Sequence, residues 1–316
     1  MSEPEKTPPA NWERAVLEKL ALSAIQEQRR SRHWSILFKT LGFLYLFIVL
    51  FLAAGWFGGD GVSIKEHTAL IDLQGVISAD QTSADSVISS LQGAFEDKKT
   101  KGVILRINSP GGSPVQAGQI YDEIKRLRAL NPKVPLYVVV DDICASGGYY
   151  VAVGADKIFV DKASIVGSIG VLMDGFGFTQ TMEKLGVERR LLTAGENKGF
   201  LDPFSPVDPK HEAFAKQMLE EIHGQFIGVV REGRGKRLKE TPEMFSGLVW
   251  SGEKSIELGL ADGLGSVESV ARDVIKAEDI VDYTRQDSLV ERLAGRLGAT
   301  MAKAWSPFEK SGVALR

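Results

Sequence analysis

The chain has 316 residues, of which 44% are hydrophobic and 25% are charged, a balance typical of a globular protein with one large domain or two ordinary ones. Its formal net charge of −3 gives no electrostatic reason to expect a nucleic-acid partner. The single cysteine, Cys144, excludes an intramolecular disulfide and a four-cysteine zinc site, and no histidine belongs to a metal-binding motif, so we expect no metal and no cofactor.

The N-terminal part is predicted to anchor the protein in a membrane. Residues 1–35 are polar and charged and contain the basic cluster Arg29, Arg30 and Arg32, whereas residues 41–57 carry no charge. A helix over residues 36–57 would be about 33 Å long at ~1.5 Å per residue, which is enough to cross a bilayer core. We therefore predict a cytoplasmic tail at 1–35 and a transmembrane helix at 36–58.

The charges around this helix predict its orientation. Basic residues precede the apolar run, and Gly58-Gly59-Asp60 follows it. The positive-inside rule then places the N-terminus in the cytoplasm and everything after residue 60 outside it. A cleaved signal peptide is the alternative, because residues 53–55 are small enough for a cleavage site, but the long polar leader favours an uncleaved anchor.

From residue 67 onward, the sequence pattern alternates between strand-like and helix-like segments. This alternation predicts an α/β domain over residues 63–285. Apolar, β-branched runs indicate strands, and amphipathic stretches between them indicate helices. The predicted strands are 67–77, 102–108, 136–140, 157–160 and 189–193, and the predicted helices are 85–95, 115–130 and 209–232. Because helices connect successive strands, we expect β-α-β units and a largely parallel sheet.

Two further helices are predicted in the C-terminal part of the chain, within residues 248–265 and 286–316. Residues 248–265 suit a short helix that Gly259 ends in the left-handed conformation. The basic run at 231–239 has acidic neighbours and is predicted to be a solvated helix end. Residues 286–316 are predicted to be an amphipathic helix or tail that packs on the core or on another copy. Its apolar stripe consists of Leu289, Leu293, Leu297, Met301 and Trp305.

The stretch D-D-I-C-A-S-G-G at residues 141–148 places Ser146 between a strand and a following helix. The first N–H groups of a helix have no intrahelical partner, so they and the positive end of the helix dipole can stabilise a developing anion. This position suits a nucleophile. An N-cap serine followed by a close-packing glycine pair is an equally good hypothesis at this point.

A second glycine-bearing turn, S-P-G-G at residues 109–112, lies at the end of another predicted strand. The carboxyl ends of parallel strands meet at one edge of a sheet, so the two turns can face each other. The N–H groups of Gly112 and Gly147 would then form an oxyanion hole around an acyl group on Ser146. A plain β-turn at Pro110-Gly111 is the alternative.

A serine nucleophile needs a base, and this sequence offers lysine. The pattern G-x-S-x-G fails because position 144 is cysteine, and no motif places a histidine for a Ser-His-Asp triad. A lysine can act as base where burial lowers its pKa from about 10.4 toward roughly 7 to 8. Lys198 is a candidate because Phe200, Leu201 and Phe204 lie beside it, although most lysines are solvated.

Five segments resemble the signal peptide peptidase A family of serine peptidases and together cover about residues 66–275. They are S-P-G-G at 109–112, A-S-G-G-Y-Y at 145–150, V-G-S-I-G-V at 166–171, E-N-K-G at 196–199 and W-S-G-E-K-S-I-E-L-G-L-A-D-G-L-G at 250–265. The resemblance is to short, single-domain bacterial members. It implies a crotonase/Clp protease-like α/β fold, a spiral of β-β-α units.

The same resemblance implies roles for individual residues. Ser146 matches the nucleophile, Lys198 the general base, Ser168 the serine that orients the lysine ammonium, and Gly112 and Gly147 the oxyanion donors. The implied substrates are remnant signal peptides or unfolded hydrophobic chains. The implied assembly is a homo-oligomeric dome on the bacterial inner membrane, with its catalytic domain in the periplasm.

Three other functions are compatible with the same features. A quality-control protease of the same fold would act on misfolded envelope proteins. An acyl-CoA-handling crotonase would use a similar oxyanion hole without a serine nucleophile. A non-catalytic membrane scaffold would have an exposed, ion-paired Lys198 far from Ser146.

Overall fold

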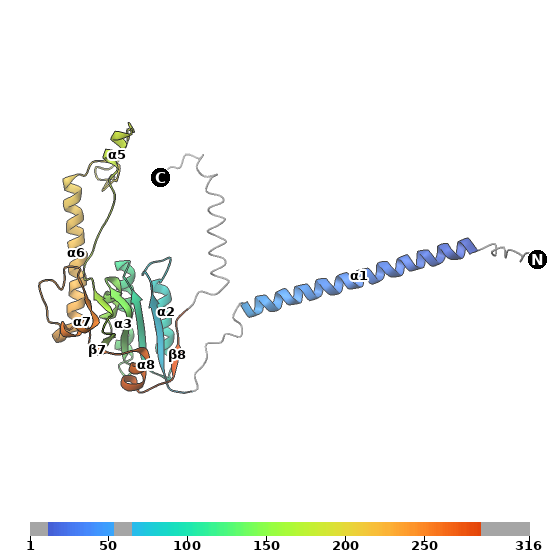
Figure 1. Cartoon of the computed structure of the whole chain (residues 1–316), viewed down its shortest axis with the longest axis horizontal. Coiled ribbons are helices and arrows are strands. Elements are labelled where there is room, and N and C mark those ends of the chain that lie inside the picture. The colour runs from blue at the N-terminus through green and yellow to red at the C-terminus, as the bar shows by residue number, and fades with distance from the viewer. Residues whose placement is uncertain (1–11, 54–64, 286–316) are drawn as a thin grey trace, which may run out of the picture. The chain divides into compact units, whose positions relative to one another are not determined.

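The computed structural model describes residues 12–53 and 65–285 of the chain. The chain divides into two units, whose described parts are residues 12–53 and residues 65–285 (Figure 1). The predicted C-terminal helix or tail at 286–316 and the last residues of the predicted transmembrane helix lie outside the described residues.

The first unit contains helix α1 (Trp12–Ala53), which is continuous over 42 residues. The predicted tail and the predicted transmembrane segment therefore share one helix where they are described, because no proline or glycine separates them. Its segment Glu27–Phe51 contains an 18-residue stretch with a mean hydropathy of 2.0 and is long and apolar enough to cross a membrane. None of its most apolar stretch is buried, unlike the core helix of a globular domain.

The second unit is built on a sheet in the order β6-β5-β3-β2-β1-β8, with β4 beside β3 and β7 beside β4. Its long central strands are β1 (His67–Gln74), β2 (Thr100–Ser109) and β3 (Leu136–Ala145), joined in parallel through helices α2 (Ala84–Glu96) and α3 (Pro114–Leu130). These crossovers confirm the predicted β-α-β units. The antiparallel pairing of β5 with β6 is the exception to the parallel order.

The remaining elements complete a mixed α/β fold. They are α4 (Gly147–Ala152), β4 (Lys157–Val160), β5 (Ile165–Gly167), α5 (Thr179–Lys184), α6 (Pro209–Arg234), η1 (Gly235–Arg237), β6 (Val249–Ser251), α7 (Gly252–Glu257), β7 (Gly263–Leu264), α8 (Val267–Ser269), η2 (Val270–Ile275) and β8 (Ile280–Asp282). Gly259 follows α7 at a φ of +75°, in the left-handed conformation that the sequence predicts.

The sheet is buried on both faces, as expected for parallel strands. Ile71, Leu105 and Val138 pair across β1, β2 and β3 and belong to the main core. Ile104 and Val139, their neighbours in sequence, belong to a smaller cluster with Phe159 and residues 267–271. The strands therefore hold their carboxyl ends, which carry the predicted site, in a fixed register.

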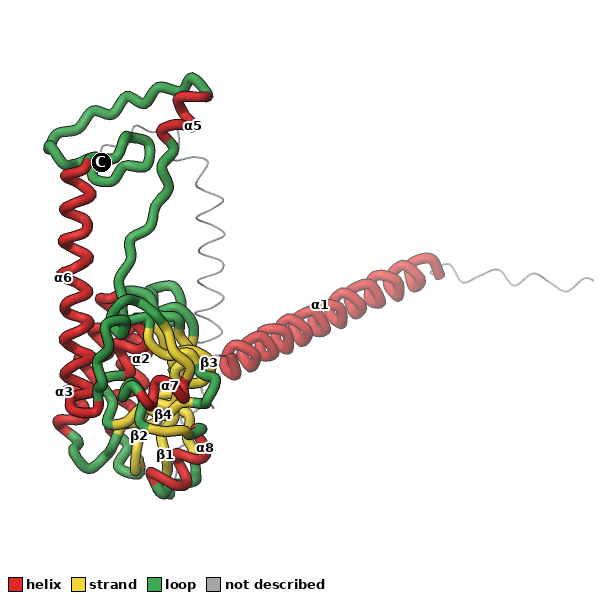
Figure 2. Tube along the Cα trace, turned by 60° about the vertical axis from the view of Figure 1, so that its left-hand side comes forward, coloured by secondary structure: helices red, strands yellow, loops and turns green. Residues whose placement is uncertain are grey.

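The chain leaves the sheet in residues 172–208, which we call the arm. It then returns to the sheet along α6. Figures 1 and 2 show α5 near the end of α6 that lies away from the sheet. Large apolar side chains of the arm are exposed, with Leu172 80% and Leu192 96% accessible. The strand predicted at 189–193 is wrong, because no strand of the described chain pairs with these residues.

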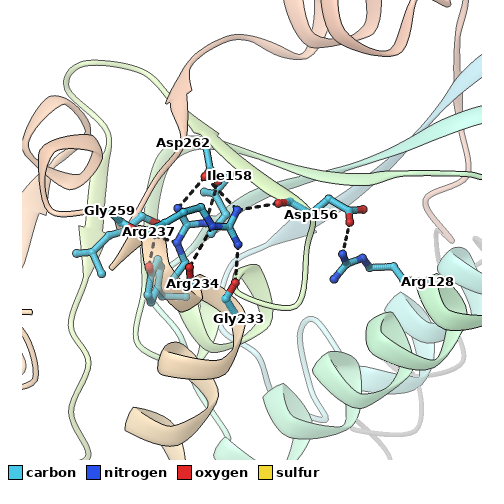
Figure 3. A network of polar contacts seen from close by, with 10 residues as sticks. Arg128, Asp156, Ile158, Gly233, Arg234, Arg237, Gly259 and Asp262 are labelled. Atoms are coloured by element: carbon cyan, nitrogen blue, oxygen red, sulfur yellow. Dashed lines mark hydrogen bonds and ion pairs between the residues drawn. The ribbon is translucent and has the colours of Figure 1, made fainter. Parts of the chain in front are cut away.

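The other end of α6 is fixed to the sheet by a buried cation. Arg234 is 2% exposed and donates hydrogen bonds to the Gly259 carbonyl at 2.7 Å and to both carboxylate oxygens of Asp262 at 2.8 and 3.0 Å (Figure 3). Burial acts to raise the pKa of Asp262, but the Arg234 guanidinium holds this pKa below its ordinary value. The prediction of a solvated helix end is therefore wrong at Arg234, because an acidic partner distant in sequence makes its burial favourable.

Candidate active site

Ser146 adopts a backbone conformation that is unusual for a residue with a side chain. It connects β3 to α4 with φ of 51° and ψ of −123°, and its side chain makes no capping hydrogen bond to the helix. Its N–H donates to the Gly167 carbonyl at 2.9 Å, and its carbonyl accepts from Tyr150 N–H at 2.9 Å. Such strain costs about 1–3 kcal/mol and persists mainly at functional sites. The alternative of a side-chain N-cap is therefore wrong.

The two glycine-bearing turns lie against each other, as predicted. A Cβ built on Gly111 would fall 2.7 Å from Gly147 N, and one on Gly147 would fall 3.2 Å from Gly112 N. A Cβ on Gly148 would fall 3.1 Å from the Ser109 carbonyl oxygen. Side chains at these positions would separate the turns, which explains the glycines in both motifs.

The N–H groups of Gly112 and Gly147 are available to a ligand. In the β-bridge between Gly112 and Ile77, the Ile77 N–H donates to the Gly111 carbonyl and the Ser113 N–H donates to the Ile77 carbonyl. The N–H of Gly112 takes no part in this bridge and points away from Ile77. Gly147 is the first residue of α4, where the N–H has no intrahelical acceptor. Neither group has an acceptor among the described residues. Two adjacent free donors can stabilise an oxyanion.

Ser146 opens into a cavity of about 510 Å³. Four predicted site residues line it together: Gly112, Ser146, Gly147 and Ser168. Its apolar wall contains Tyr150, Val171, Leu172, Ile222 and Phe226. Burial raises the pKa of the Tyr150 hydroxyl, so this group stays protonated at neutral pH. The cavity has the mixed character of a ligand-binding site, with a few polar groups in an apolar wall.

Ser168 has a constrained backbone of its own. Its φ is 53°, and its N–H donates to the Leu248 carbonyl at 2.7 Å. Gly167, before it, packs against Trp250, and a Cβ there would fall 2.7 Å from the indole ring. The pairing of β5 with β6 thus fixes the turn that presents Ser168 to the cavity.

Lys198 is exposed and lies on the arm, apart from the other predicted site residues. His211 Nε2 donates to the Asn197 side chain at 3.2 Å, and the Phe200 ring packs on His211 at a centroid distance of 5.3 Å. The loop of Lys198 therefore sits at the first turn of α6. Phe226, which lines the cavity, is 15 residues further along, or about 22 Å at ~1.5 Å per residue. A single chain does not bring Lys198 to Ser146.

Sequence reasoning missed the contribution of α6 to the cavity. Ile222, Gln225 and Phe226 all line it. Their i, i+3, i+4 spacing was a detectable signal, because it places them on one face of the helix. It could not show that this face reaches the cavity at Ser146.

Cys144, two residues before Ser146, is buried. Burial raises the pKa of the Cys144 thiol, which keeps it neutral and unreactive beside the serine. Within residues 12–53 and 65–285, no group of three or more histidine, cysteine or acidic side chains could hold a metal ion.

Comparison with known proteins agrees with the predicted fold. Residues 128–280 match Peptidase family S49, and residues 65–166 match Clp protease. A putative protease of Methanocaldococcus jannaschii is 31% identical over 219 residues, which are 68% of this chain and 70% of that protein. A putative signal peptide peptidase SppA of Enterococcus faecium is 30% identical and covers 66% of this chain and 60% of its own.

A protein of Brucella abortus named Na(+)/H(+) antiporter NhaA is 42% identical over 216 residues. The match covers 66% of this chain but only 29% of that protein, so this chain corresponds to less than a third of its length. The family matches, the archaeal relative and the Clp-like α/β sheet together show that the chain belongs to peptidase family S49, the proteases of the signal peptide peptidase A type.

Proposed function

We propose that the protein is a membrane-anchored serine endopeptidase with Ser146 as nucleophile and Lys198 as base. The observation that carries the proposal is the strained, uncapped Ser146 beside the free N–H groups of Gly112 and Gly147. A capping or turn serine needs neither the strain nor two unused donors. Nucleophile and anion-binding groups at one point are the requirements of acyl transfer.

In the proposed mechanism, Ser146 Oγ attacks the carbonyl carbon of the scissile peptide bond while its proton passes to Lys198 Nζ. Gly112 and Gly147 N–H groups donate to the oxyanion that forms. The C–N bond then breaks, and the lysine ammonium returns the proton to the leaving amine. Water attacks the acyl-enzyme with Lys198 again taking the proton, and Ser146 is regenerated. Ser168 orients the lysine ammonium.

Lys198 reaches the nucleophile, in this proposal, from a neighbouring copy of the chain. The separation of about 22 Å along α6 argues against a dyad within one chain. The apolar side chains exposed on the arm favour burial against another copy, which would also remove water from Lys198. We propose a homo-oligomer for this reason.

The scaffold hypothesis predicts an exposed Lys198 far from Ser146, and the single chain has both features. It also predicts an ion pair, and Lys198 forms none among the described residues. A scaffold gives no reason for the strain at Ser146. The peptidase proposal accounts for both residues once a second copy supplies the lysine.

The proposed substrates are remnant signal peptides or other unfolded hydrophobic chains. The apolar cavity wall suits such chains, and the Enterococcus relative is named a putative signal peptide peptidase. The proposed location is the bacterial inner membrane, with α1 as a single-pass anchor, the N-terminus in the cytoplasm and the catalytic unit in the periplasm. A quality-control protease of misfolded envelope proteins would differ only in substrate.

Labelling with a serine-reactive fluorophosphonate tests the proposal. We expect the purified oligomer to carry one adduct per chain, located on Ser146 by peptide mass spectrometry, and to lose peptide hydrolysis in proportion to labelling. An enzyme that stays unlabelled while turning over an acyl-CoA thioester would support the crotonase alternative instead. Cleavage rates on signal peptides and on an unfolded protein separate the two peptidase hypotheses.

A further inference from the structure

One histidine contacts the segment that carries Ser168. His223 on α6 donates its Nε2–H to the Ile169 carbonyl at 3.1 Å, since a carbonyl oxygen can only accept. Ile169 is fully buried. The other three histidines bond elsewhere: His33 to the Arg29 carbonyl, His67 to the Tyr283 hydroxyl and His211 to the Asn197 side chain.

The backbone around Ser168 needs several restraints, because a serine at a φ of 53° is strained. Ser168 N–H donates to the Leu248 carbonyl at 2.7 Å, and the Ser168 carbonyl accepts from Gly170 N–H at 2.9 Å. Both of these bonds are between backbone groups. The bond from His223 to Ile169 is a hydrogen bond that depends on a side chain.

We propose that His223 is a positioning residue that holds Ser168 toward the cavity, and this inference rests on the proposed role of Ser168 in orienting Lys198. Ile222, its neighbour, lines the cavity, whereas His223 does not. His223 therefore acts through the Ile169 carbonyl and not on the substrate.

Two substitutions of His223 by polar residues, His223→Gln and His223→Asn, distinguish the hydrogen bond to Ile169 from a general packing role of the side chain. Glutamine places its amide N–H₂ at the distance of Nε2 and can donate to the Ile169 carbonyl, whereas the shorter asparagine cannot. We expect His223→Asn to lower kcat on a fluorogenic peptide by about tenfold or more with little change in KM, as misplacement of a catalytic group does. His223→Gln should keep most of the wild-type kcat. Gln217→Leu, an exposed change on the same helix, is the control.

A double-mutant cycle tests whether the effect passes through Ser168. In the Ser168→Ala background, His223→Asn should cause little further loss, because the group it positions is gone. Equal activity of the Asn and Gln variants, or losses that multiply in the double variant, would overturn the inference. Loss of all activity in a folded His223→Gln variant would do the same, since a side-chain donor to the Ile169 carbonyl would then not be sufficient.

Failure of the proposed function has a different signature. Full activity of both Ser168→Ala and Lys198→Ala would reject the dyad whatever His223 does. Large losses in those two variants together with wild-type activity in His223→Asn would reject the positioning role alone. Thermal unfolding midpoints of all variants show whether any loss comes from the fold instead.

Discussion

Gly111 lies against Ser146 so closely that a Cβ built on the glycine would fall 2.7 Å from Ser146 Cβ, at a glycine φ of +104°. The distance joins the two turns of the site, one at the end of β2 and one at the end of β3. We expect Gly111→Ala to push Gly147 and Ser146 away from Gly112. Loss of one oxyanion donor lowers kcat by about 10²–10³-fold in other enzymes, and steady-state kinetics should give a loss of that order.

Gly118→Ala is the matched control for this change. Gly118 lies in α3 with nothing within 4 Å of a built Cβ. Alanine in a helix is more favourable than glycine by about 0.5–1 kcal/mol, so the variant should unfold at a slightly higher temperature with unchanged kcat. Wild-type activity in Gly111→Ala would show that contact between the turns does not matter for catalysis.

The proposed sharing of Ser146 and Lys198 between copies predicts complementation. Ser146→Ala and Lys198→Ala should each abolish peptide hydrolysis without unfolding the protein. If the two variants are dissociated, mixed in equal amounts and reassembled at random into a head-to-tail ring, about one site in four receives both residues. Activity should return to roughly a quarter of the wild-type value.

A dyad within one chain would give no activity in this mixture. The corresponding control mixes Ser146→Ala with the double variant, which should stay inactive in either arrangement. Activity in either single variant alone would reject the Ser/Lys mechanism.

The pair of Arg234 and Asp262 predicts a large loss of stability on substitution. Asp262→Asn leaves the Arg234 cation buried without a counter-charge, which costs about 3–5 kcal/mol in the free energy of unfolding. Denaturant titration measures this value. Glu240→Gln removes the partner of the exposed Arg231 and should change the same quantity little.

The lowered pKa of Asp262 also predicts a pH dependence. A carboxyl group whose pKa is lower in the folded state adds stability above its ordinary pKa of 3.8, and this stability disappears as the pH falls through the folded value. The wild type should therefore lose more stability than Asp262→Asn between pH 5 and pH 2, as a rough range. Parallel stability curves for the two proteins would contradict this assignment.

The proposed anchor predicts which part of the protein is accessible from outside the cell membrane. In spheroplasts, added protease should digest the unit of residues 61–285 and leave an N-terminal tag protected until the membrane is permeabilised. Leu46→Arg places a charge near the middle of the predicted transmembrane helix at 36–58 and should weaken membrane integration by about 2.5–3.5 kcal/mol. A protected catalytic unit would reverse the proposed orientation.

The sequence by itself determined the local elements and placed the proposed nucleophile between a strand and a helix. Periodicity located β1, β2, β3, α2 and α3 because burial follows the geometry of each element. The glycine turns were predictable because only residues without Cβ allow their close approach.

Only the tertiary structure decided which predicted residues meet. Lys198 and Ser146 belong to equally clear motifs. Within one chain, however, the length of helix α6 separates them, because the loop of Lys198 lies at its first turn and the cavity lies further along it. The segment at 189–193 has strand-like residues and no partner strand, and Arg234 is buried because Asp262 lies opposite it. Strand pairing and the burial of a charged residue depend on contacts between distant parts of the chain. A local sequence pattern contains no information about these contacts.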